Sequence, residues 1–371
     1  MIDLLPTGVK CVKMTMKKMM EAGVMGVKKA LADAGRVTIG MDIWTKKGYT
    51  SAYLGISASF FQPTMKKAVH IVLNLHIVEH PHTGAMIASL LQKTLDAWQI
   101  PSSKILMIIT DNGSNMVRAV KDLKAQQEAD MSSEEEDEPV DSMGSEEMEA
   151  GEVKIDGSYK RLPCLAHGIQ LVVHVLDKIP SYCDPLQKAR SVVNRIRMSS
   201  VATQKLLCKA GKTIVSDCPT RWSSSFLMVT RLLELKTSIN DVFDELKWDS
   251  LLTSEWAKLE EIMYLLQPFA EHTNTLQTDV VSLSNVIPVI LDLQCHLDAP
   301  ELNHTMAVSL SAALKKRFSR YLIPADDEFN PLPAAACLLS PDVAKIILKD
   351  PNYQSLLHAA KSCILILVCS V

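Results

Sequence analysis

The chain has 371 residues, of which 47% are hydrophobic, and a formal net charge of −3. This length has room for two or three domains, and the apolar share is large enough to bury a core. No apolar run approaches the roughly 20 residues that span a bilayer, which excludes a membrane-spanning helix. We expect no secretory signal, because residues 1–10 lack an apolar stretch before a cleavage site. The nine scattered cysteines indicate reduced thiols in a reducing compartment.

The negative charge is concentrated in one segment. Twelve acidic residues lie between Glu128 and Glu152, and no lysine or arginine occurs between Lys124 and Lys154. Without these twelve acids the rest of the chain has a net charge of +9. This moderate positive charge permits contact with a phosphate backbone, although many proteins with neutral ligands have a similar excess.

The first third of the chain alternates between helical and strand patterns. Residues 14–34 are rich in Met, Lys and Ala, which predicts a helix. Three strand-like runs follow at 36–42, 49–61 and 69–78, separated by the short breaks 46–48 and 62–64. Such closely spaced runs are typical of an antiparallel meander.

A helix and a buried strand come next. Thr83 is a candidate N-cap for a helix over 84–99, where apolar residues recur at helical spacing. The nearly continuous apolar run 104–111 predicts a strand that is buried on both faces. A further helix extends to about Leu123. The order β-β-β-α-β-α predicts an α/β fold with an RNase H-like core.

The rest of the chain is predicted to be mostly helical. We expect a disordered acidic loop at 125–157, because the segment is dense in Glu and Ser and low in aromatic residues. Helices are predicted at 165–176, 187–208, 224–246, 251–277, 283–296 and 307–321. Beyond the linker 324–333, residues 334–339 are expected to form a returning strand, and a helix begins near 341. The predicted domains are an N-terminal helical segment (1–35), the core (36–124), the acidic loop (125–157), an all-helical insertion (158–323), and a linker with an incomplete return to the core (324–371).

Two aspartates form the main candidate site. Asp42 and Asp111 each end an apolar run, and the first and fourth strands of an RNase H-like sheet are parallel neighbours, so both carboxylates are expected at one edge. Paired carboxylates are suitable ligands for Mg²⁺ or Mn²⁺ in phosphoryl transfer. Each residue alone has another interpretation, because an aspartate that ends a strand often caps the next turn or helix.

Four sequence motifs around these residues resemble those of hAT transposases, and most closely the zinc finger BED domain-containing branch. The resemblance covers about residues 30 to 345. It rests on Asp42-Ile43-Trp44-Thr45, Thr110-Asp111-Asn112-Gly113-Ser114-Asn115-Met116, Cys164-Leu165-Ala166-His167 and Thr220-Arg221-Trp222.

The resemblance implies a metal-dependent catalytic site with three acids. Asp42 and Asp111 match the first two, and the third is unknown, since Ser340-Pro341-Asp342 departs from the family's pattern. Neither the family's BED finger nor most of its C-terminal dimerisation region is expected within this chain. Whether the protein is an enzyme is left open, and the missing acid favours an incomplete catalytic site.

The resemblance also implies a nucleic-acid contact at Arg221 and Trp222, where the tryptophan stacks on an unpaired base. In the other interpretation, Trp222 anchors the core and Arg221 pairs with an acid such as Asp217. Cys164 and His167 are candidate zinc ligands. They are also compatible with a buried thiol at a helix start and a structural histidine.

We therefore expect a transposase-derived nuclear protein that associates with DNA or chromatin and acts in regulation. One alternative is a DNA transposase fragment with Mg²⁺-dependent strand cleavage. Another is a protein-interaction scaffold without nucleic-acid contact. The expected partners are DNA, bound weakly or without sequence specificity, other chromatin proteins or a homo-oligomer, and no membrane.

Overall fold

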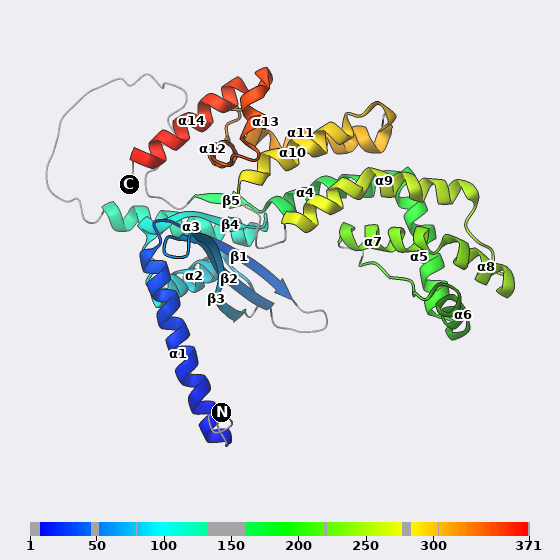
Figure 1. Cartoon of the computed structure of the whole chain (residues 1–371), viewed down its shortest axis with the longest axis horizontal. Helices are drawn as coiled ribbons and strands as arrows, with labels where there is room; N and C mark the ends of the chain where they lie inside the picture. The colour runs from blue at the N-terminus through cyan, green and yellow to red at the C-terminus, as the bar shows by residue number, and fades with distance from the viewer. Residues whose placement is uncertain are drawn as a thin grey trace. The chain divides into compact units, whose positions relative to one another are not determined.

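The structure is a computed structural model. It describes residues 8–45, 52–78, 80–132, 160–218, 221–276, 283–302 and 304–369. Side chains of residues 126–132 are not described. The chain divides into two compact units, Met1–Cys164 and Leu165–Val371 (Figure 1). Within the described ranges, no helix combines the length and the apolar character needed to cross a membrane.

The first unit contains a five-stranded sheet in the order β3-β2-β1-β4-β5. The strands are β1 (Val37–Thr45), β2 (Ala52–Gln62), β3 (Lys67–Val78), β4 (Ile105–Thr110) and β5 (Arg161–Pro163). Strands β1, β2 and β3 pair antiparallel, so the predicted meander is confirmed. Strand β4 is parallel to β1, and β5, which was not predicted, is parallel to β4.

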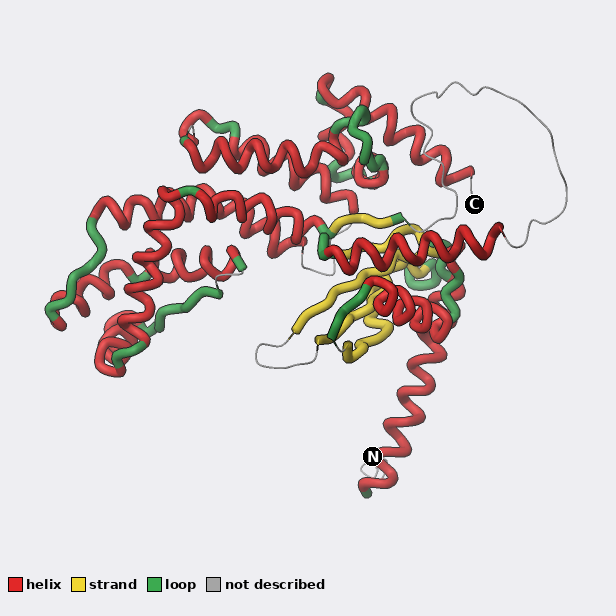
Figure 2. The backbone as a smooth tube through the Cα atoms, turned by 180° about the vertical axis from the view of Figure 1, so that it is seen from behind, coloured by secondary structure: helices red, strands yellow, loops and turns green. Residues whose placement is uncertain are grey.

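One face of this sheet carries the core. Alternate residues of β1 and β2, such as Ile39 and Ile56, are fully buried because side chains along a strand point to opposite faces in turn. They form one apolar cluster with Leu31 of α1 (Val9–Asp33), Leu91 of α2 (Gly84–Trp98) and Met116 of α3 (Ser114–Ser132). Figure 2 shows the strands in yellow and these helices in red. This mixed α/β architecture agrees with the predicted RNase H-like core.

The ends of α2 are held by side chains. Thr83 Oγ1 accepts a hydrogen bond from Met86 N at 3.3 Å, so the predicted N-cap is confirmed. Trp98 Nε1 donates to Leu73 O of β3 at 3.0 Å and fixes the other end. The next helix, α3, continues to Ser132, past its predicted end and into the range predicted as loop. The rest of that predicted loop, 133–157, lies outside the described residues.

The second unit is helical. Its first helices are α4 (Leu165–Val173), α5 (Pro180–Arg197), α6 (Ser200–Ala210), α7 (Trp222–Glu234), α8 (Lys236–Leu246), α9 (Thr253–Leu276), α10 (Val286–Leu297) and α11 (Thr305–Leu322). Short 3-10 helices lie at His174–Lys178, Leu283–Asn285, Pro300–Leu302 and Pro351–Tyr353 of this unit, and at Ser102–Lys104 of the first unit. The predicted helix 187–208 is divided in two, because Ser199 Oγ accepts from Ala202 N at 3.2 Å and starts α6.

The last segment corrects one prediction. Residues 334–339, expected as a returning strand, lie in helix α12 (Leu332–Leu339), which is followed by α13 (Ala344–Lys349) and α14 (Gln354–Cys369). Three consecutive alanines favour a helix, and Pro333 stands in the first turn, where its missing N–H costs nothing. The buried Ala334, Ala335 and Cys337 show that this helix is packed, and its closest neighbours include α14.

Candidate functional site

The two predicted acids lie at the same edge of the sheet. Strand β1 pairs with β4 in parallel, and the last pair in this register is Gly40 with Ile109. Two residues further along both strands are Asp42 and Asp111. Neighbouring strands are about 4.8 Å apart, so this register brings the two backbones side by side at the carboxyl end of the parallel pair.

Asp42 departs from its predicted place in one respect. It does not end β1, because the strand continues to Thr45, which pairs with Ala52 of β2. The antiparallel pairing with β2 extends three residues past Asp42, whereas the parallel pairing with β4 ends earlier. Asp42 is exposed and pairs with Gly55 of β2. It therefore lies on the surface of a paired strand.

Asp111 is held in a turn that leads into α3. Its Oδ1 accepts a hydrogen bond from Gly113 N at 3.0 Å, and Asn115 Oδ1 accepts from Met116 N at 3.0 Å. A Cβ at position 113 would lie 2.9 Å from Asn115 Oδ1 and 3.1 Å from Asp111 Oδ1, so a larger residue there would displace the side chains of this turn. One carboxylate oxygen of Asp111 thus stabilises the turn, as the capping interpretation expects.

An arginine that sequence reasoning missed stabilises the same turn. Arg161 of β5 donates from Nε to Thr110 Oγ1 at 2.8 Å, and from Nη2 to Asn112 Oδ1 at 2.7 Å and to the backbone oxygen of Asp111. Thr110 Oγ1 also donates to that backbone oxygen, at 2.8 Å. The only signal in the sequence is a basic residue three positions before Cys164, which by itself indicates no particular role.

The candidate metal ligands of this chain are two carboxylates, Asp42 and Asp111, and the pair Cys164 and His167. Two carboxylates at one sheet edge offer the hard oxygen ligands that Mg²⁺ or Mn²⁺ prefers. Across the described ranges, no group of three or more His, Cys, Asp or Glu side chains is arranged to hold a metal ion. Cys164 follows β5, where its N–H donates to Thr110 O at 2.8 Å, and His167 lies in α4. Neither of these candidate zinc ligands belongs to such a group.

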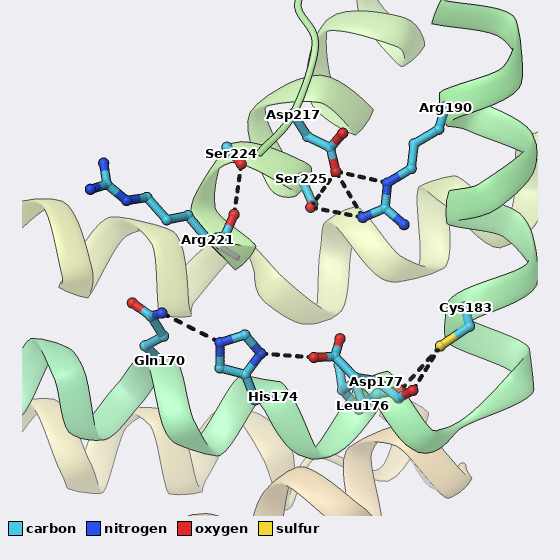
Figure 3. Close-up of polar contacts among 10 residues, drawn as sticks. All are labelled: Gln170, His174, Leu176, Asp177, Cys183, Arg190, Asp217, Arg221, Ser224 and Ser225. Atoms are coloured by element: carbon cyan, nitrogen blue, oxygen red, sulfur yellow. Dashed lines mark hydrogen bonds and ion pairs between the residues drawn. The ribbon is translucent and has the colours of Figure 1, made fainter. Parts of the chain in front are cut away.

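The second predicted contact lies at the start of α7. Trp222 is only 4% exposed, and its ring meets Phe226 edge to face with centroids 6.4 Å apart. Arg221 is exposed, and its guanidinium points away from the neighbouring polar cluster (Figure 3). Pro219 and Thr220 lie outside the described residues. This geometry favours the core-anchor interpretation for Trp222 and leaves Arg221 as the accessible member of the pair.

The loop before α7 is tied to α5 by an ion pair. Asp217 Oδ2 accepts hydrogen bonds from Arg190 Nε and from Ser225 Oγ, both at 2.8 Å (Figure 3). One interpretation of the sequence paired Asp217 with Arg221. In the structure the partner of Asp217 is Arg190. Ser224 Oγ donates to Arg221 O at 2.7 Å and holds the backbone at the start of the helix.

These contacts set the charge state of Asp217, whose side chain is only 8% exposed. Burial alone raises the pKa of this carboxyl. The hydrogen bonds from Arg190 and Ser225 outweigh burial, and the pKa of Asp217 lies below its ordinary value. Asp217 is therefore a structural anion that positions the loop leading to Arg221.

A further polar chain crosses the same part of the second unit. His174 contacts Gln170 at 3.3 Å and Asp177 at 2.8 Å, and Cys183 Sγ contacts Asp177 O at 3.2 Å (Figure 3). Burial and then the charge of Asp177 raise the pKa of the Cys183 thiol. A thiol with a raised pKa is a poor nucleophile, so this chain links α4 to α5 and has no catalytic geometry.

Comparisons with known proteins match both units. The model of the ZBED1 RNase-like domain matches residues 40–136, and that of the ZBED1 RNase-like helical domain matches residues 162–265. The first match contains Asp42 and Asp111, and the second contains Arg221 and Trp222. Together the two matches cover more than half of the chain.

Several curated proteins are similar over long stretches. A Talaromyces stipitatus protein named as a transcriptional regulator, tpeD, is 23% identical over 92% of this chain and 40% of its own length. Human zinc finger BED domain-containing protein 4 is 28% identical over 46% of this chain and 16% of its own length. A Zea mays protein named as an AC transposase is 23% identical over 85% of this chain and 37% of its own length. The chain therefore spans less than half the length of each of these relatives.

Proposed function

Because the chain belongs to the transposase-derived hAT family that includes the zinc finger BED domain-containing proteins, we propose that it is a nuclear protein that associates with DNA or chromatin. It acts in regulation, and its strand-cleaving centre is incomplete. Relatives named as a transcriptional regulator and as BED zinc finger proteins support this role. A fluorescent fusion of the chain is expected to accumulate in the nucleus.

The observation that carries the proposal is the end of the parallel β1–β4 pair, where Asp42 and Asp111 each follow the last registered pair, Gly40 and Ile109, by two residues. Two carboxylates alone repel a phosphate backbone, so a nucleic acid approaches this edge only when cations are present. The guanidinium of Arg161, bonded to the turn at Asp111, supplies one positive charge. A bound divalent cation would supply the rest.

The two aspartates are suitable for one such cation. Asp111 Oδ1 accepts the Gly113 N–H, which leaves Oδ2 as the oxygen directed to a ligand by this proposal. Mg²⁺ or Mn²⁺ would be held by Asp42 and Asp111, with water and phosphate oxygens completing its coordination. When bound, it would neutralise charge on a phosphate and polarise its oxygens. A third carboxylate is the residue that the proposal regards as missing.

A second candidate function is metal-dependent strand cleavage, favoured by the same placement of Asp42 and Asp111 just beyond the registered β1–β4 pairs. The two candidates differ in whether a third acid completes the site. They also differ in a measurable way, since association requires only that DNA be retained, whereas cleavage requires a new strand end.

The test is a titration of the purified chain with Mg²⁺ or Mn²⁺ in the presence of nicked and hairpin DNA, followed by a cleavage gel and a binding assay over a range of salt. The control is the double variant Asp42→Asn/Asp111→Asn, in which the amide oxygen introduced at position 111 can still accept the Gly113 N–H. We expect salt-sensitive binding without cleavage. If the wild type cleaves DNA and the double variant does not, the proposal is wrong and metal-dependent strand cleavage is the function. A complete lack of DNA retention at low salt would favour the interaction scaffold.

A further inference from the structure

Helix α1 carries an apolar stripe that is packed at one end and bare at the other. At its C-terminal end, Leu31 belongs to the core cluster, and Val27 and Ala30 pack against it. The same face continues towards the N-terminus at helical spacing. Every residue from Val9 to Gly23 is exposed there, and Figure 1 shows this part of α1, in blue, leading away from the sheet. The large apolar residues on the exposed part of the stripe are Val9, Val12, Met16, Met19 and Met20.

A row of lysines lies beside this stripe. Lys10, Lys13 and Lys17 are three and four residues apart, so they share one flank of the helix. Helix α1 holds six lysines, one glutamate and one aspartate, which gives it a net charge of +4. Among the described residues, Lys17 alone of these six is in an ion pair, with Glu21 at 3.9 Å. Both of its side chains are largely exposed, and such a pair contributes little to stability.

The exposed stretch of α1 gains little stability from its own sequence. An isolated helix of about 15 residues is marginal in water. The like charges of the lysine row repel one another at this spacing, and Gly23 and Gly26 are poor helix formers. A partner that stabilises the stretch needs negative charge for the row and apolar groups for the stripe. A second copy of α1 has the apolar groups but the same positive charge.

One segment of the same chain has both properties. The acidic run, residues 133–152, holds ten Asp and Glu and no Lys or Arg, and Val140, Met143 and Met148 lie among these acids. It follows α3 and precedes β5, which belong to the same unit as α1. Residues 133–159 connect these two elements, and at roughly 3.4 Å per residue they can extend about 45 Å and return. Helix α1 is about 37 Å long, so the run is long enough to lie along it.

We propose that the acidic run docks along the exposed stretch of α1 in the same chain, with its carboxylates on the lysine row and its apolar side chains on the stripe. Charge complementarity favours this occupant over a second α1. Attachment to the same unit also gives the run a high effective concentration at the helix. The inference goes beyond the proposed function, because this contact forms within one chain and without nucleic acid.

Hydrogen–deuterium exchange of the purified full chain, without DNA, tests the contact. In the wild type, the amides of residues 12–25 are expected to be protected. Replacing the ten acids of the run by Gln and Asn should make these amides exchange about tenfold faster and leave those of α2 unchanged. Raising the salt to about 0.5 M should have a similar effect on the wild type, because salt screens exposed charges. Unchanged exchange of α1 in the neutralised variant would overturn the proposal.

A pair of lysine variants separates docking from the stability of the helix itself. Lys10→Gln/Lys13→Gln removes repulsion within α1, so an undocked helix would exchange no faster. A docked helix should lose protection, because the run loses two of its cationic contacts. The matched control Lys66→Gln/Lys67→Gln removes two exposed lysines at the start of β3, in the same unit, and should leave the exchange of α1 unchanged. Equal exchange in both variants and the wild type would contradict docking on the lysine row.

The apolar part of the contact has its own test. Met16→Ala/Met19→Ala removes two exposed side chains from the stripe. Alanine is the better helix former, so an uncovered α1 would exchange more slowly in this variant. Faster exchange is the expected result, and slower exchange would show that the run does not cover the stripe.

Cross-linking identifies the occupant of α1. A carbodiimide joins neighbouring lysines and carboxylates, and it is applied to an equal mixture of unlabelled and isotope-labelled chain. We expect cross-links between lysines of α1 and acids of the run in which both peptides carry the same label. Pairs with mixed labels in the statistical proportion would overturn the proposal and show that a second copy supplies the run. Protection of α1 that appears only after duplex DNA is added would overturn it in favour of a phosphate backbone as the occupant.

Discussion

At the scale of single residues, Asp111 combines two roles that require different properties of its side chain. As a turn residue it needs only an acceptor at Oδ1 for the Gly113 N–H. As a ligand it needs a negative charge. Asparagine supplies the acceptor without the charge, and alanine supplies neither, so the two roles can be separated by substitution.

We predict that Asp111→Ala lowers the free energy of unfolding by about 1 kcal/mol, because the turn before α3 loses its side-chain acceptor. Asp111→Asn should retain most of that stability while losing any affinity for Mg²⁺. Chemical denaturation measures the first effect, and metal titration measures the second. If the alanine variant is as stable as the wild type, the hydrogen bond to Gly113 contributes nothing to the fold.

Trp222 and Arg221 are adjacent in the chain but lie in different surroundings. The sequence resemblance paired them as a nucleic-acid contact, whereas the indole is buried in the helical unit and the guanidinium faces solvent. To stack on a base, the indole would have to leave the core.

The expected results for these two residues are therefore opposite. Trp222→Ala should destabilise the second unit by about 3–5 kcal/mol, since a large buried ring leaves a cavity. Arg221→Ala should leave the melting temperature nearly unchanged and weaken DNA binding with a smaller salt slope. A folded Trp222→Ala variant with normal stability and reduced DNA affinity would restore the stacking role of this residue.

At the scale of elements, the loop between α6 and α7 depends on one buried anion. Asp217 receives hydrogen bonds from α5 through Arg190 and from α7 through Ser225. Surface loops are usually more mobile than the elements that they connect. This loop is anchored through Asp217, close to Arg221, which leads into α7. The anchor therefore determines where the exposed guanidinium is presented.

We predict that Arg190→Ala costs about 1–3 kcal/mol, because it leaves the Asp217 carboxylate buried without its charged partner. The pKa of Asp217 is lower in the folded chain than its ordinary value of 3.8, so its contribution to stability is present above that value. The contribution is lost as the pH falls through the folded-state pKa. Wild-type protein should therefore lose more stability than Asp217→Asn between about pH 5 and pH 3, as measured by urea denaturation. Parallel losses in the two proteins would show that Asp217 is not the titrating group.

At the scale of the whole molecule, the distribution of charge matters more than its sum. The acidic segment, residues 128–152, holds twelve of the acids, and the remaining chain is basic. A negatively charged segment competes with DNA for basic residues, and it also repels DNA and so lowers the local DNA concentration. Salt screens both effects.

Replacing Glu134, Glu135, Glu136, Asp137 and Glu138 by Gln or Asn changes the net charge from −3 to +2. The prediction is a several-fold higher affinity for duplex DNA at about 50 mM salt, and a difference that nearly vanishes at about 0.5 M. A matched control replaces the serines of the same segment by alanine and leaves its charge unchanged. An affinity that is unchanged at both salt concentrations would show that the segment does not act through its charge.

Several features of this protein follow from local sequence patterns alone. The three closely spaced strand-like runs in residues 36–78 predicted the meander, and Thr83 was identified as a cap because its side chain acts within one helical turn. The positions of Asp42 and Asp111 after apolar runs predicted a shared sheet edge, since the carboxyl ends of parallel strands meet there. These predictions succeed because the interactions involved depend on residues close together in the chain or on the regular geometry of strands.

Other features depend on partners that no local pattern specifies. Arg161 reaches the turn at Asp111 across 50 residues of sequence, and the three-residue strand that places it was too short to recognise. Residues 334–339 are apolar enough for a strand, and their packing among helices decides the outcome. The indole of Trp222 is buried while that of Trp44 lies exposed over Gly55, although both belong to equally clear motifs. The sequence determined the order of strands and helices in residues 36–123 and identified Asp42 and Asp111 as candidate acids. Only the tertiary structure decided which side chains meet and which face solvent, because burial and long-range hydrogen bonds depend on how distant segments pack.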